Sequence, residues 1–330
     1  ASATPVLWRV QWAMWRYLWR DFYNPNAIYA EGERVRAQST KHKAQIAKIL
    51  GVAKENIIFT SGGTEANVLA VQGVAEGRVV VEAGSHPSVS EAMRSTKLKK
   101  VILVSSTTTD NKLGRKIREK RKKNNSEYPL LHIDASQSAQ YFNVGLEALQ
   151  CDLLTLDSAK LYGPKGCGAL VVRHRNLIKL PPRGTPPTVL IAGFAKALEI
   201  AVKDREKEFA RLDSLSAMFA SELQKFFPQV EITKTLPNII NLSVPACAGR
   251  PEVLPELLVL ALDKAGLMVS AGPACESNKP EPRETPVRFS LGRGTTEKDI
   301  REAIKIFCQT LENMLKYPHA TALQPLHNQG

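Results

Sequence analysis

The chain has 330 residues, of which 43% are hydrophobic and 23% are charged, and its formal net charge at pH 7 is +13. A chain of this length can bury a large core, so we expect two domains or one large domain with an appendage. Its longest apolar runs, such as LLVLALDKAG, are far shorter than the ~20 residues that span a bilayer. We therefore expect no membrane span and no membrane partner. The first residues, ASATPVLWRV, lack the pattern of a signal peptide, which favours a cytoplasmic location.

The cysteines are odd in number, form no CxxC pair and have no histidine at metal-ligand spacing. They are Cys151, Cys167, Cys247, Cys275 and Cys308. Disulfides and a structural zinc site are therefore not expected. The net charge suits nucleic acid, an anionic surface or an acidic protein equally well. The basic run GRKIREKRKKNN, residues 114–125, is more typical of a solvated helix end than of an RNA-binding patch, because no aromatic residues interleave. We expect no direct binding of nucleic acid.

The first predicted helix carries every tryptophan of the chain, at steps of four, three and four residues: Trp8, Trp12, Trp15 and Trp19. This spacing places them on one helical face, which we interpret as a packing surface. A second helix is predicted over residues 29–50, with Gly51 ending it. From there, short apolar runs alternate with helical stretches: NIIFT, VVVE, VILVS, PLLHID and LLTLD. This alternation predicts an α/β fold with a mostly parallel central sheet and helices on both faces.

After about residue 188 the pattern changes. A long helical tract leads to the short strands VEIT, NIINLSV and VRFSLG, with a helix near 252–265 and a final helix from Thr296. This mixture predicts a smaller α+β domain. We predict a large domain over residues 8–193 and a small C-terminal domain made of residues 1–7 and 194–330.

In a parallel sheet, ligands bind beyond the carboxyl ends of the strands. TSGGTEAN offers Gly62, Gly63 and Thr64 at a strand end before a helix, where backbone N–H groups can hold a phosphate. HIDASQ places Asp134 after an apolar strand, where its burial requires a positive partner such as a pyridinium nitrogen. DSAKLYGPKG places Lys160 at the same edge, where a lysine of lowered pKa can form a Schiff base. Together these are the parts of a pyridoxal phosphate (PLP) site.

The series of motifs resembles the cysteine desulfurases of the class-V aminotransferase group, which includes selenocysteine lyases. It covers most of the chain, in the family's order: ASATP, YNPNAIYAEG, IIFTSGGTEAN, SHPSV, HIDASQSA, KLYGPKGCGALVVR, RGTPP, LPNIINLS, VSAGPAC and VRFSLGRGTTEKDI. The resemblance implies fold type I of the PLP enzymes, a homodimer, and L-cysteine as the substrate. It also implies that the large domain binds PLP and that the small domain carries the catalytic cysteine loop.

The resemblance assigns roles to residues near the cofactor ring. Lys160 is similar to the lysine that binds PLP covalently and then moves protons at the substrate Cα. Asp134 matches the aspartate at the pyridine nitrogen, and Gln137 the glutamine at the ring hydroxyl. His86, in GSHPSV, matches the histidine that stacks on the ring and serves in acid–base steps.

Further roles concern the phosphate and the substrate. The glycine pair with Gly63, and Thr64, match the phosphate cradle, and Thr185 resembles a threonine that reaches the phosphate from the partner subunit. Arg288 matches the arginine that clamps the substrate carboxylate, a task suited to its planar fork. Asn111, in DNKLG, is similar to an asparagine near the ring and the carboxylate.

Cys275, in VSAGPACES, matches the catalytic cysteine. The implied reaction converts L-cysteine to L-alanine and leaves a persulfide on Cys275 for a sulfur acceptor or an iron–sulfur scaffold protein. Thiolates are strong nucleophiles, and an ordinary thiol pKa of ~8.5 leaves some thiolate near neutrality. Cys167, in KGCGAL, lies at a strand entry among small residues and is expected to be packed and inert.

The chain departs from the family pattern in several places, two of which concern the predicted site directly. The family has S-x-H-K before the cofactor lysine, with both Ser and His serving the phosphate, whereas this chain has Asp157, Ser158, Ala159 and Lys160. Ser158 is then the residue left to serve the phosphate, and Asp157 would repel it unless its carboxylate points away or is paired. In addition, only twelve residues separate Cys275 from Arg288, which restricts the reach of the cysteine.

Three functions remain open from the sequence. A cysteine desulfurase is favoured because Cys275 and Arg288 occur together with the complete ring-binding set. A selenocysteine lyase, or another class-V aminotransferase or lyase, would use the same residues. A trimmed paralogue that acts through partner binding would account for the missing phosphate ligands. No metal is implied by any of them.

Overall fold

The computed structural model describes residues 3–74, 77–82, 85–93, 101–181, 184–245, 254–271 and 284–316. The chain divides into two compact units, residues 2–205 and 206–330. The helix α7 (Thr188–Phe226) runs from the first unit into the second. The predicted domain limits, 8–193 for the large domain and 1–7 with 194–330 for the small one, stay a proposal.

The first unit contains one sheet with the strand order β1-β6-β5-β4-β3-β2. The strands are β1 (Ile57–Thr60), β2 (Arg78–Val81), β3 (Val101–Ser106), β4 (Leu130–Asp134), β5 (Leu153–Asp157) and β6 (Gly168–Val172). Strands β2 to β5 are mutually parallel, and β6 runs antiparallel to both β5 and β1. The predicted α/β fold with a mostly parallel sheet is confirmed, with β6 as the reversed strand.

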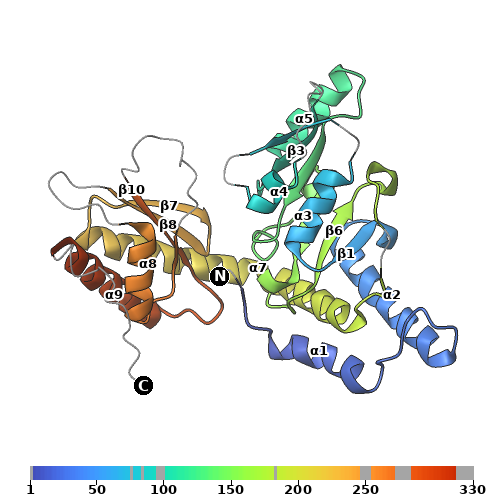
Figure 1. Cartoon of the computed structure of the whole chain (residues 1–330), viewed down its shortest axis with the longest axis horizontal. Helices are drawn as coiled ribbons and strands as arrows, with labels where there is room; N and C mark the ends of the chain where they lie inside the picture. Colours follow the sequence, from blue (N-terminus) through green and yellow to red (C-terminus); the bar gives the residue numbers. More distant parts are fainter. Residues whose placement is uncertain are drawn as a thin grey trace, which may run out of the picture. The chain divides into compact units, whose positions relative to one another are not determined.

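Helices cover both faces of this sheet (Figure 1). They are α1 (Trp8–Trp19), α2 (Ala30–Leu50), α3 (Gly63–Gln72), α4 (Pro87–Glu91), α5 (Lys112–Lys123), α6 (Leu146–Leu149) and the first part of α7, with the 3₁₀ turns η1 (Lys54–Asn56), η2 (Ser158–Lys160) and η3 (Arg175–Leu177). Successive strand side chains point to opposite faces, so Ile57 packs with α2 and α7 while Ile58 packs with α3 and α4. Both faces are apolar, which explains the uninterrupted hydrophobic runs of the strands.

The predicted limits of two helices can be compared directly with the structure. Helix α2 ends at Leu50, and Gly51 follows in the left-handed region with φ 68°, as expected for a glycine that terminates a helix. The basic run forms helix α5, whose last turn carries four cations. One of them, Arg121, binds the buried carboxylate of Asp152 and so contributes to the fold. Both helix predictions are confirmed.

The second unit contains an antiparallel sheet in the order β7-β8-β10-β9, in agreement with the predicted α+β character. Its strands are β7 (Glu231–Leu236), β8 (Ile239–Pro245), β9 (Ser270–Ala271) and β10 (Glu284–Ser290), and its helices are α8 (Pro255–Lys264), α9 (Glu297–Lys316) and the remainder of α7. Phe289 of β10 packs against Phe219 of α7 and Phe307 of α9, with ring centroids 4.8 and 5.7 Å apart. These aromatic contacts join the sheet to its two long helices.

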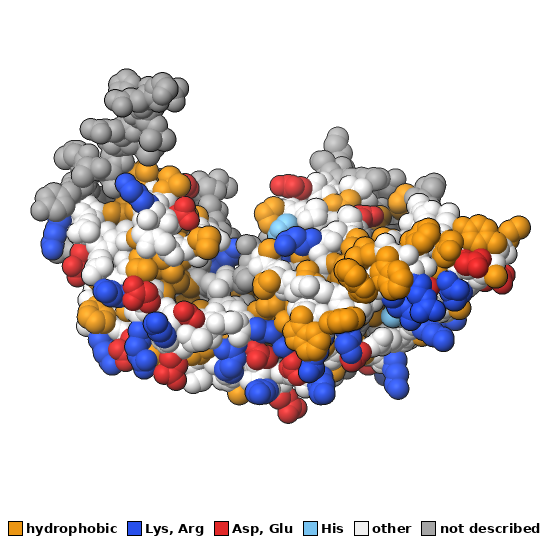
Figure 2. Space-filling model, turned by 90° about the horizontal axis from the view of Figure 1, so that it is seen from below, with side chains coloured by type: hydrophobic (Ala, Val, Ile, Leu, Met, Phe, Trp, Pro, Cys, Tyr) orange, Lys and Arg blue, Asp and Glu red, His pale blue; other side chains and the backbone are white. Residues whose placement is uncertain are grey.

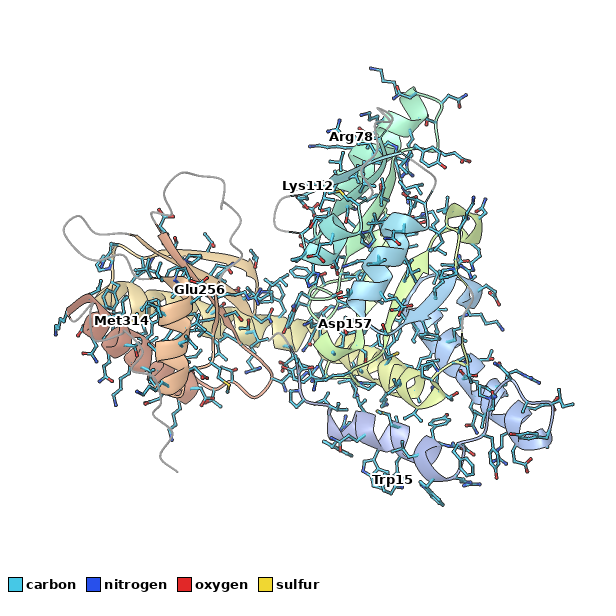
Figure 3. All side chains as sticks on the ribbon, in the orientation of Figure 1. Trp15, Arg78, Lys112, Asp157, Glu256 and Met314 are labelled. Atoms are coloured by element: carbon cyan, nitrogen blue, oxygen red, sulfur yellow. The ribbon has the colours of Figure 1, made fainter. Side chains whose placement is uncertain are left out.

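The tryptophan face of α1 is not packed against the described residues, so the expectation of a packing surface is wrong for the part of the chain that the structure describes. The four indoles are between 57% and 69% exposed, and Leu18 and Phe22 beside them are exposed as well. The opposite face of α1 is buried through Val10 and Tyr17. Trp15 projects away from the unit in Figure 3, and Figure 2 shows orange hydrophobic side chains beside blue Lys and Arg on this side. The spacing of the tryptophans predicted a common face but not which way it points.

A buried histidine connects three strands of the central sheet. His132 of β4 is fully buried; its Nδ1 lies 2.9 Å from Ser105 Oγ of β3 and its Nε2 lies 2.9 Å from Thr155 Oγ1 of β5. Burial lowers the pKa of His132 from 6.5 to about 4, against the opposing influence of Asp134. The ring is therefore neutral at pH 7 and exchanges hydrogen bonds with two hydroxyl groups.

Among the helices that the structure describes, none is long and apolar enough to cross a membrane.

Intrinsic fluorescence reports only on α1, because every tryptophan of the chain lies there. We expect the native protein to emit near the wavelength of tryptophan in water and to be quenched efficiently by acrylamide, with the guanidinium-unfolded protein as the fully exposed reference. A blue-shifted emission that resists acrylamide would show that this face is covered in solution. Dilution would then test whether a second copy covers it.

Stability should fall as the pH is lowered through the range in which His132 binds a proton only after unfolding. The unfolded histidine titrates near pH 6.5 and the folded one near 4, so the unfolded state takes up more protons between these values. The free energy of unfolding should therefore decrease, by up to about 3 kcal/mol. Urea titrations of His132→Gln should show a flatter decline. His174→Gln, which changes an exposed histidine, should decline as steeply as the wild type.

Candidate active site

The ends of β1 and β5 and the start of β6 lie side by side at the carboxyl edge of the central sheet, because β6 runs antiparallel to both neighbours. Gly168, the first residue of β6, pairs with the last residues of β1 and β5, Thr60 and Asp157. A Cβ on Gly168 would lie 2.7 Å from the carbonyl carbon of Gly62 and 2.7 Å from the oxygen of Leu156. Only a glycine therefore lets the turn after β1 cross the start of β6.

This turn ends in helix α3, whose first residue touches the loops after two other strands. A Cβ on Gly63 would lie 2.9 Å from Ser136 Oγ, after β4, and 3.4 Å from Asp157 Oδ2, at the end of β5. The space beside Gly62 is open, with no atom within 4 Å of an added Cβ. The first N–H groups of a helix have no partner within it, so this end of α3 is an anion-binding position. Thr64 follows and is exposed.

Asp134 is the last residue of β4 and its carboxylate is held on both sides. Its Oδ1 accepts the backbone N–H of Ser136 at 3.0 Å, and its Oδ2 accepts the side-chain N–H of Asn67 at 2.8 Å. Asn67 comes from the interior of α3, so this bond ties the end of β4 to the helix that starts after β1. The carboxylate remains partly exposed and keeps further acceptor capacity.

His86 caps the N-terminus of the short helix α4. Its Nδ1 accepts the backbone N–H of Ser88 at 3.2 Å and lies 2.7 Å from Ser88 Oγ. Ser88 Oγ also accepts a hydrogen bond from Asn67, at 3.0 Å. The structure thus brings His86 and Asp134 together through two side chains that the sequence did not single out.

Lys160 ends the 3₁₀ turn η2, directly after β5, and is partly buried. Thr4 holds the residues on either side of this lysine: its N–H and its hydroxyl both donate to the oxygen of Ala159, at 3.1 and 2.8 Å, and its Oγ1 accepts the N–H of Tyr162 at 2.9 Å. The N-terminal segment thereby fixes the backbone that carries Lys160. The ASATP motif is the signal by which Thr4 could have been found.

The two unusual residues before Lys160 have different environments. Asp157, labelled in Figure 3, accepts the N–H of Ala159 with Oδ1 at 2.9 Å, while its Oδ2 lies beside Gly63 at the start of α3. A carboxylate therefore lies against the anion-binding position. The hydroxyl of Ser158 is buried next to Gly163, whose added Cβ would lie 2.2 Å from it, and it has no hydrogen-bond partner among the described residues.

Three other predicted site residues belong to the first unit. Gln137 follows Asp134 after β4 and is partly buried. Asn111 precedes α5, and its Oδ1 accepts two hydrogen bonds from Arg115, at 3.0 and 2.7 Å. Thr185 is exposed in the segment before α7. The structure shows no hydrogen bond from any of these three to Asp134, His86 or Lys160 within the described residues.

The second unit holds the remaining two predicted residues. Arg288 lies in β10 opposite Asn241, and its Nε is buried without a hydrogen-bond partner among the described residues. A buried guanidinium nitrogen of this kind can receive an anion. Cys275 lies outside the described residues.

The cysteines that the structure describes are unreactive thiols. Burial and the nearby Asp157 raise the pKa of Cys167 to about 12, and burial with Asp152 raises the pKa of Cys151 to about 12. Burial also raises the pKa of Cys308 to about 11. The expectation that Cys167 is packed is confirmed, since it is fully buried. A nucleophilic thiolate would have to come from elsewhere in the chain.

Comparison with known proteins identifies the family. The model of the family described as aminotransferase class-V matches residues 1–113, 91–183 and 182–302. The cysteine desulfurase IscS of Dictyoglomus turgidum is 30% identical, with 95% of this chain and 94% of that protein covered. A mitosomal cysteine desulfurase of Trachipleistophora hominis is 28% identical over all of this chain and 88% of its own.

Solved structures agree in fold. A NifS-like protein matches with a TM-score of 0.83 at 24% identity, and the NifS-like protein of Rickettsia africae matches with 0.81 at 21%; each comparison covers 94% of this chain and 98% of the other. The fold of the chain is thus that of the NifS-like proteins. With the family match along nearly its whole length, the chain belongs to the class-V aminotransferase family and, within it, to the cysteine desulfurases.

Proposed function

We propose that the protein is a PLP-dependent cysteine desulfurase that converts L-cysteine to L-alanine and retains the sulfur as a persulfide on Cys275. The observation that carries this proposal is the meeting of strand ends at one edge of the sheet. It places the start of α3, the Asp134 carboxylate and the turn that bears Lys160 around the same position. Membership of the class-V aminotransferase family supports the proposal that the cofactor is PLP.

The residues present fit this cofactor. The open space beside Gly62 and the N-terminus of α3 suit a phosphate. Buried hydroxyl groups without partners among the described residues, those of Ser136, Ser138 and Ser158, occur in the loops around this position. Asp134 supplies the negative charge that a pyridinium nitrogen needs. Two carboxylates oppose the fit: that of Asp157 beside Gly63, and that of Glu65 in the first turn of α3, which accepts the backbone N–H of Ser61 at 2.6 Å.

The roles of the chain's own groups follow from their positions. When bound, PLP supplies an electron sink for the carbon skeleton of the substrate. Lys160 would hold the cofactor and move a proton at the substrate Cα, Asp134 would keep the ring nitrogen protonated, and Gln137 would bind the ring hydroxyl. His86 would lie against the ring, and Gly63, Thr64, Ser158 and the partner's copy of Thr185 would hold the phosphate.

The substrate end of the reaction is assigned to further residues by the family resemblance. Arg288 would bind the carboxylate of L-cysteine, with Asn111 as a further ligand. The Cys275 thiolate would attack the substrate sulfur: a sulfur–sulfur bond forms, the Cβ–S bond breaks with its electrons left on carbon, and protonation of the carbon skeleton yields L-alanine. The buried cysteines, with pKa values of about 11 to 12, are unsuited to this step. Of Cys247 and Cys275, which lie outside the described residues, Cys275 is the one that matches the family's catalytic cysteine.

The proposed partners are a second copy of the chain, to complete the phosphate site through Thr185, and a sulfur-acceptor or iron–sulfur scaffold protein. A cytoplasmic location is proposed from the sequence. One relative is named as mitosomal, so organellar members of the family exist.

Lys160→Ala tests the enzyme directly. Purified wild-type protein with added PLP should develop the visible absorbance band of a lysine-bound cofactor and should release alanine from cysteine, because Lys160 provides the amine for both. The variant should lose both signals. Cys275→Ser should keep the band and lose sulfur release, with Cys167→Ser as the matched control that keeps both. No band in the wild type would rule out the proposed function, and sulfur release by Cys275→Ser would rule out the nucleophile.

Asp157→Asn should bind PLP more tightly than the wild type. The substitution keeps the size of the side chain and removes a negative charge from beside the phosphate position, which is worth about 1 kcal/mol, or roughly a five- to tenfold lower Kd. Titration of PLP followed by absorbance measures this change. Glu147→Gln, which changes an exposed residue of α6 paired with Arg173, serves as a control for removing a carboxylate elsewhere. Weaker or unchanged binding in Asp157→Asn would show that this carboxylate does not act on the phosphate.

A further inference from the structure

A continuous chain of hydrogen bonds joins the two predicted ring-binding residues, Asp134 and His86. Asn67 Nδ2 donates to Asp134 Oδ2 at 2.8 Å and to Ser88 Oγ at 3.0 Å, and Ser88 Oγ lies 2.7 Å from His86 Nδ1. We propose that Asn67 and Ser88 are positioning residues that orient Asp134 and His86 together and keep the neutral imidazole of His86 protonated at Nε2. The role of this arrangement in the reaction rests on the proposed function, whereas the hydrogen bonds and the tautomer of His86 do not depend on it.

The directions of these hydrogen bonds fix the tautomer of His86. The backbone N–H of Ser88 can only donate, and it points at Nδ1 at 3.2 Å. The hydroxyl of Ser88 receives its hydrogen bond from Asn67, so its own proton is free to point at the same nitrogen. Nδ1 therefore carries the lone pair. In a neutral ring, the proton must then be on Nε2.

Asn67 is oriented by charge. Asp134 can only accept when ionised, so the amide nitrogen, not the amide oxygen, must face it. The second hydrogen of the same nitrogen goes to Ser88, and both donors are used. The oxygen Oδ1 remains buried with no partner among the described residues. One amide group thus donates to Asp134 directly and is linked to His86 through Ser88.

Packing alone would favour an apolar residue at position 67. It is 1% exposed in the interior of α3, where Asn is a poor helix former. An unpaired buried acceptor is a further disadvantage. An apolar side chain would remove both disadvantages, and it would also leave Asp134 and Ser88 without their shared donor. The two hydrogen bonds explain why an amide occupies this site.

The hydrogen bonds at Nδ1 of His86 determine which of its ring nitrogens can bind a ligand. Ser88 engages Nδ1, and the side chain of His86 is exposed, which leaves Nε2 for a ligand. Nε2 carries a proton in the neutral ring, so His86 presents a hydrogen-bond donor. In the proposed reaction, it would donate a hydrogen bond to the sulfur of the substrate, and it would not accept a proton at Nε2 while Ser88 holds Nδ1.

The test begins with the cofactor-free full chain, labelled with ¹⁵N at histidine. Two-bond ¹H–¹⁵N correlation spectra at pH 8 distinguish the two tautomers, and His86→Gln assigns the signal. We expect Nε2–H for His86 in the wild type. A predominant Nδ1–H tautomer, or an even mixture, would overturn the proposal.

Variants separate the two positioning residues. Ser88→Ala should yield a mixture of tautomers, since one of the two donors to Nδ1 is lost, and Ser88→Thr should restore the wild-type spectrum because it keeps the hydroxyl. Ser90→Ala, two residues further along α4, removes an exposed hydroxyl that donates to Pro87 and should change nothing. An unchanged tautomer in Ser88→Ala would show that the hydroxyl has no part in it.

Asn67→Leu should affect both ends of the chain of hydrogen bonds. It should shift the His86 tautomer as Ser88→Ala does and, in addition, weaken PLP binding about tenfold, because Asp134 loses a charge-assisted hydrogen bond. Ser88→Ala should leave PLP binding within about twofold. Asn56→Leu, which removes an amide bound to Arg173 O away from the site, is the matched control. If Asn67→Leu unfolds, Asn67→Ser removes both amide donors without adding bulk.

The two proposals can fail separately. If the wild type binds no PLP, the proposed function is wrong, yet the spectra of the cofactor-free protein still decide the tautomer and the part of Ser88. If PLP binds and alanine is released while Asn67→Leu alters neither tautomer nor affinity, the positioning role is wrong and the function stands.

Discussion

The site depends on the close approach of two backbone segments at the carboxyl edge of the central sheet. The turn after β1 crosses the first residue of β6 at a distance that excludes even a methyl group on Gly168. Because β6 is antiparallel, its first residue pairs with the last residues of both β1 and β5. The reversed strand therefore brings together the helix start that can bind an anion and the turn that bears Lys160. A larger residue at 168 would separate them.

The carboxylates at this edge of the sheet are held by hydrogen bonds from N–H groups. Three carboxylates, those of Asp134, Asp157 and Glu65, lie around the N-terminus of α3, which carries the positive end of the helix dipole. Asp134 is satisfied by an amide and a backbone N–H and so remains fixed in orientation. Asp157 lies closer to the first residue of α3 and is held by Ala159. The helix end beside Asp157 is also the proposed phosphate position. The carboxylate and the phosphate would therefore be drawn to the same positive potential and would repel each other.

Thiol reactivity in this protein is set by burial. The three cysteines that the structure describes lie in the two cores, where the loss of solvation raises their pKa values far above neutrality. Such thiols behave as small apolar side chains. This arrangement suits a protein whose proposed chemistry requires one thiolate to react with sulfur, because these three thiols cannot compete with it.

The sequence by itself determined the class of fold, the main elements and the type of chemistry. The alternation of apolar runs and helical stretches is a local property, and the glycines, Asp134 and Lys160 follow strand ends that the pattern identifies. The motifs TSGGTEAN, HIDASQ and DSAKLYGPKG thus predicted where a site should form. The sequence also indicated the departure at Asp157, since the resemblance to the family pattern S-x-H-K implies a serine at that position.

Only the tertiary structure decided which residues work together and which surfaces stay open. Asn67 and Ser88 are unremarkable in the sequence, since buried polar residues in helices have no local signature, and their role depends on contacts between α3, α4 and β4. Thr4 lies 155 residues before Ala159, which its hydroxyl binds, so no spacing rule could connect them. The tryptophans share one face, as their periodicity requires, but helical periodicity does not say whether a face is covered. Long-range packing decides that, and in α1 it buries the opposite side.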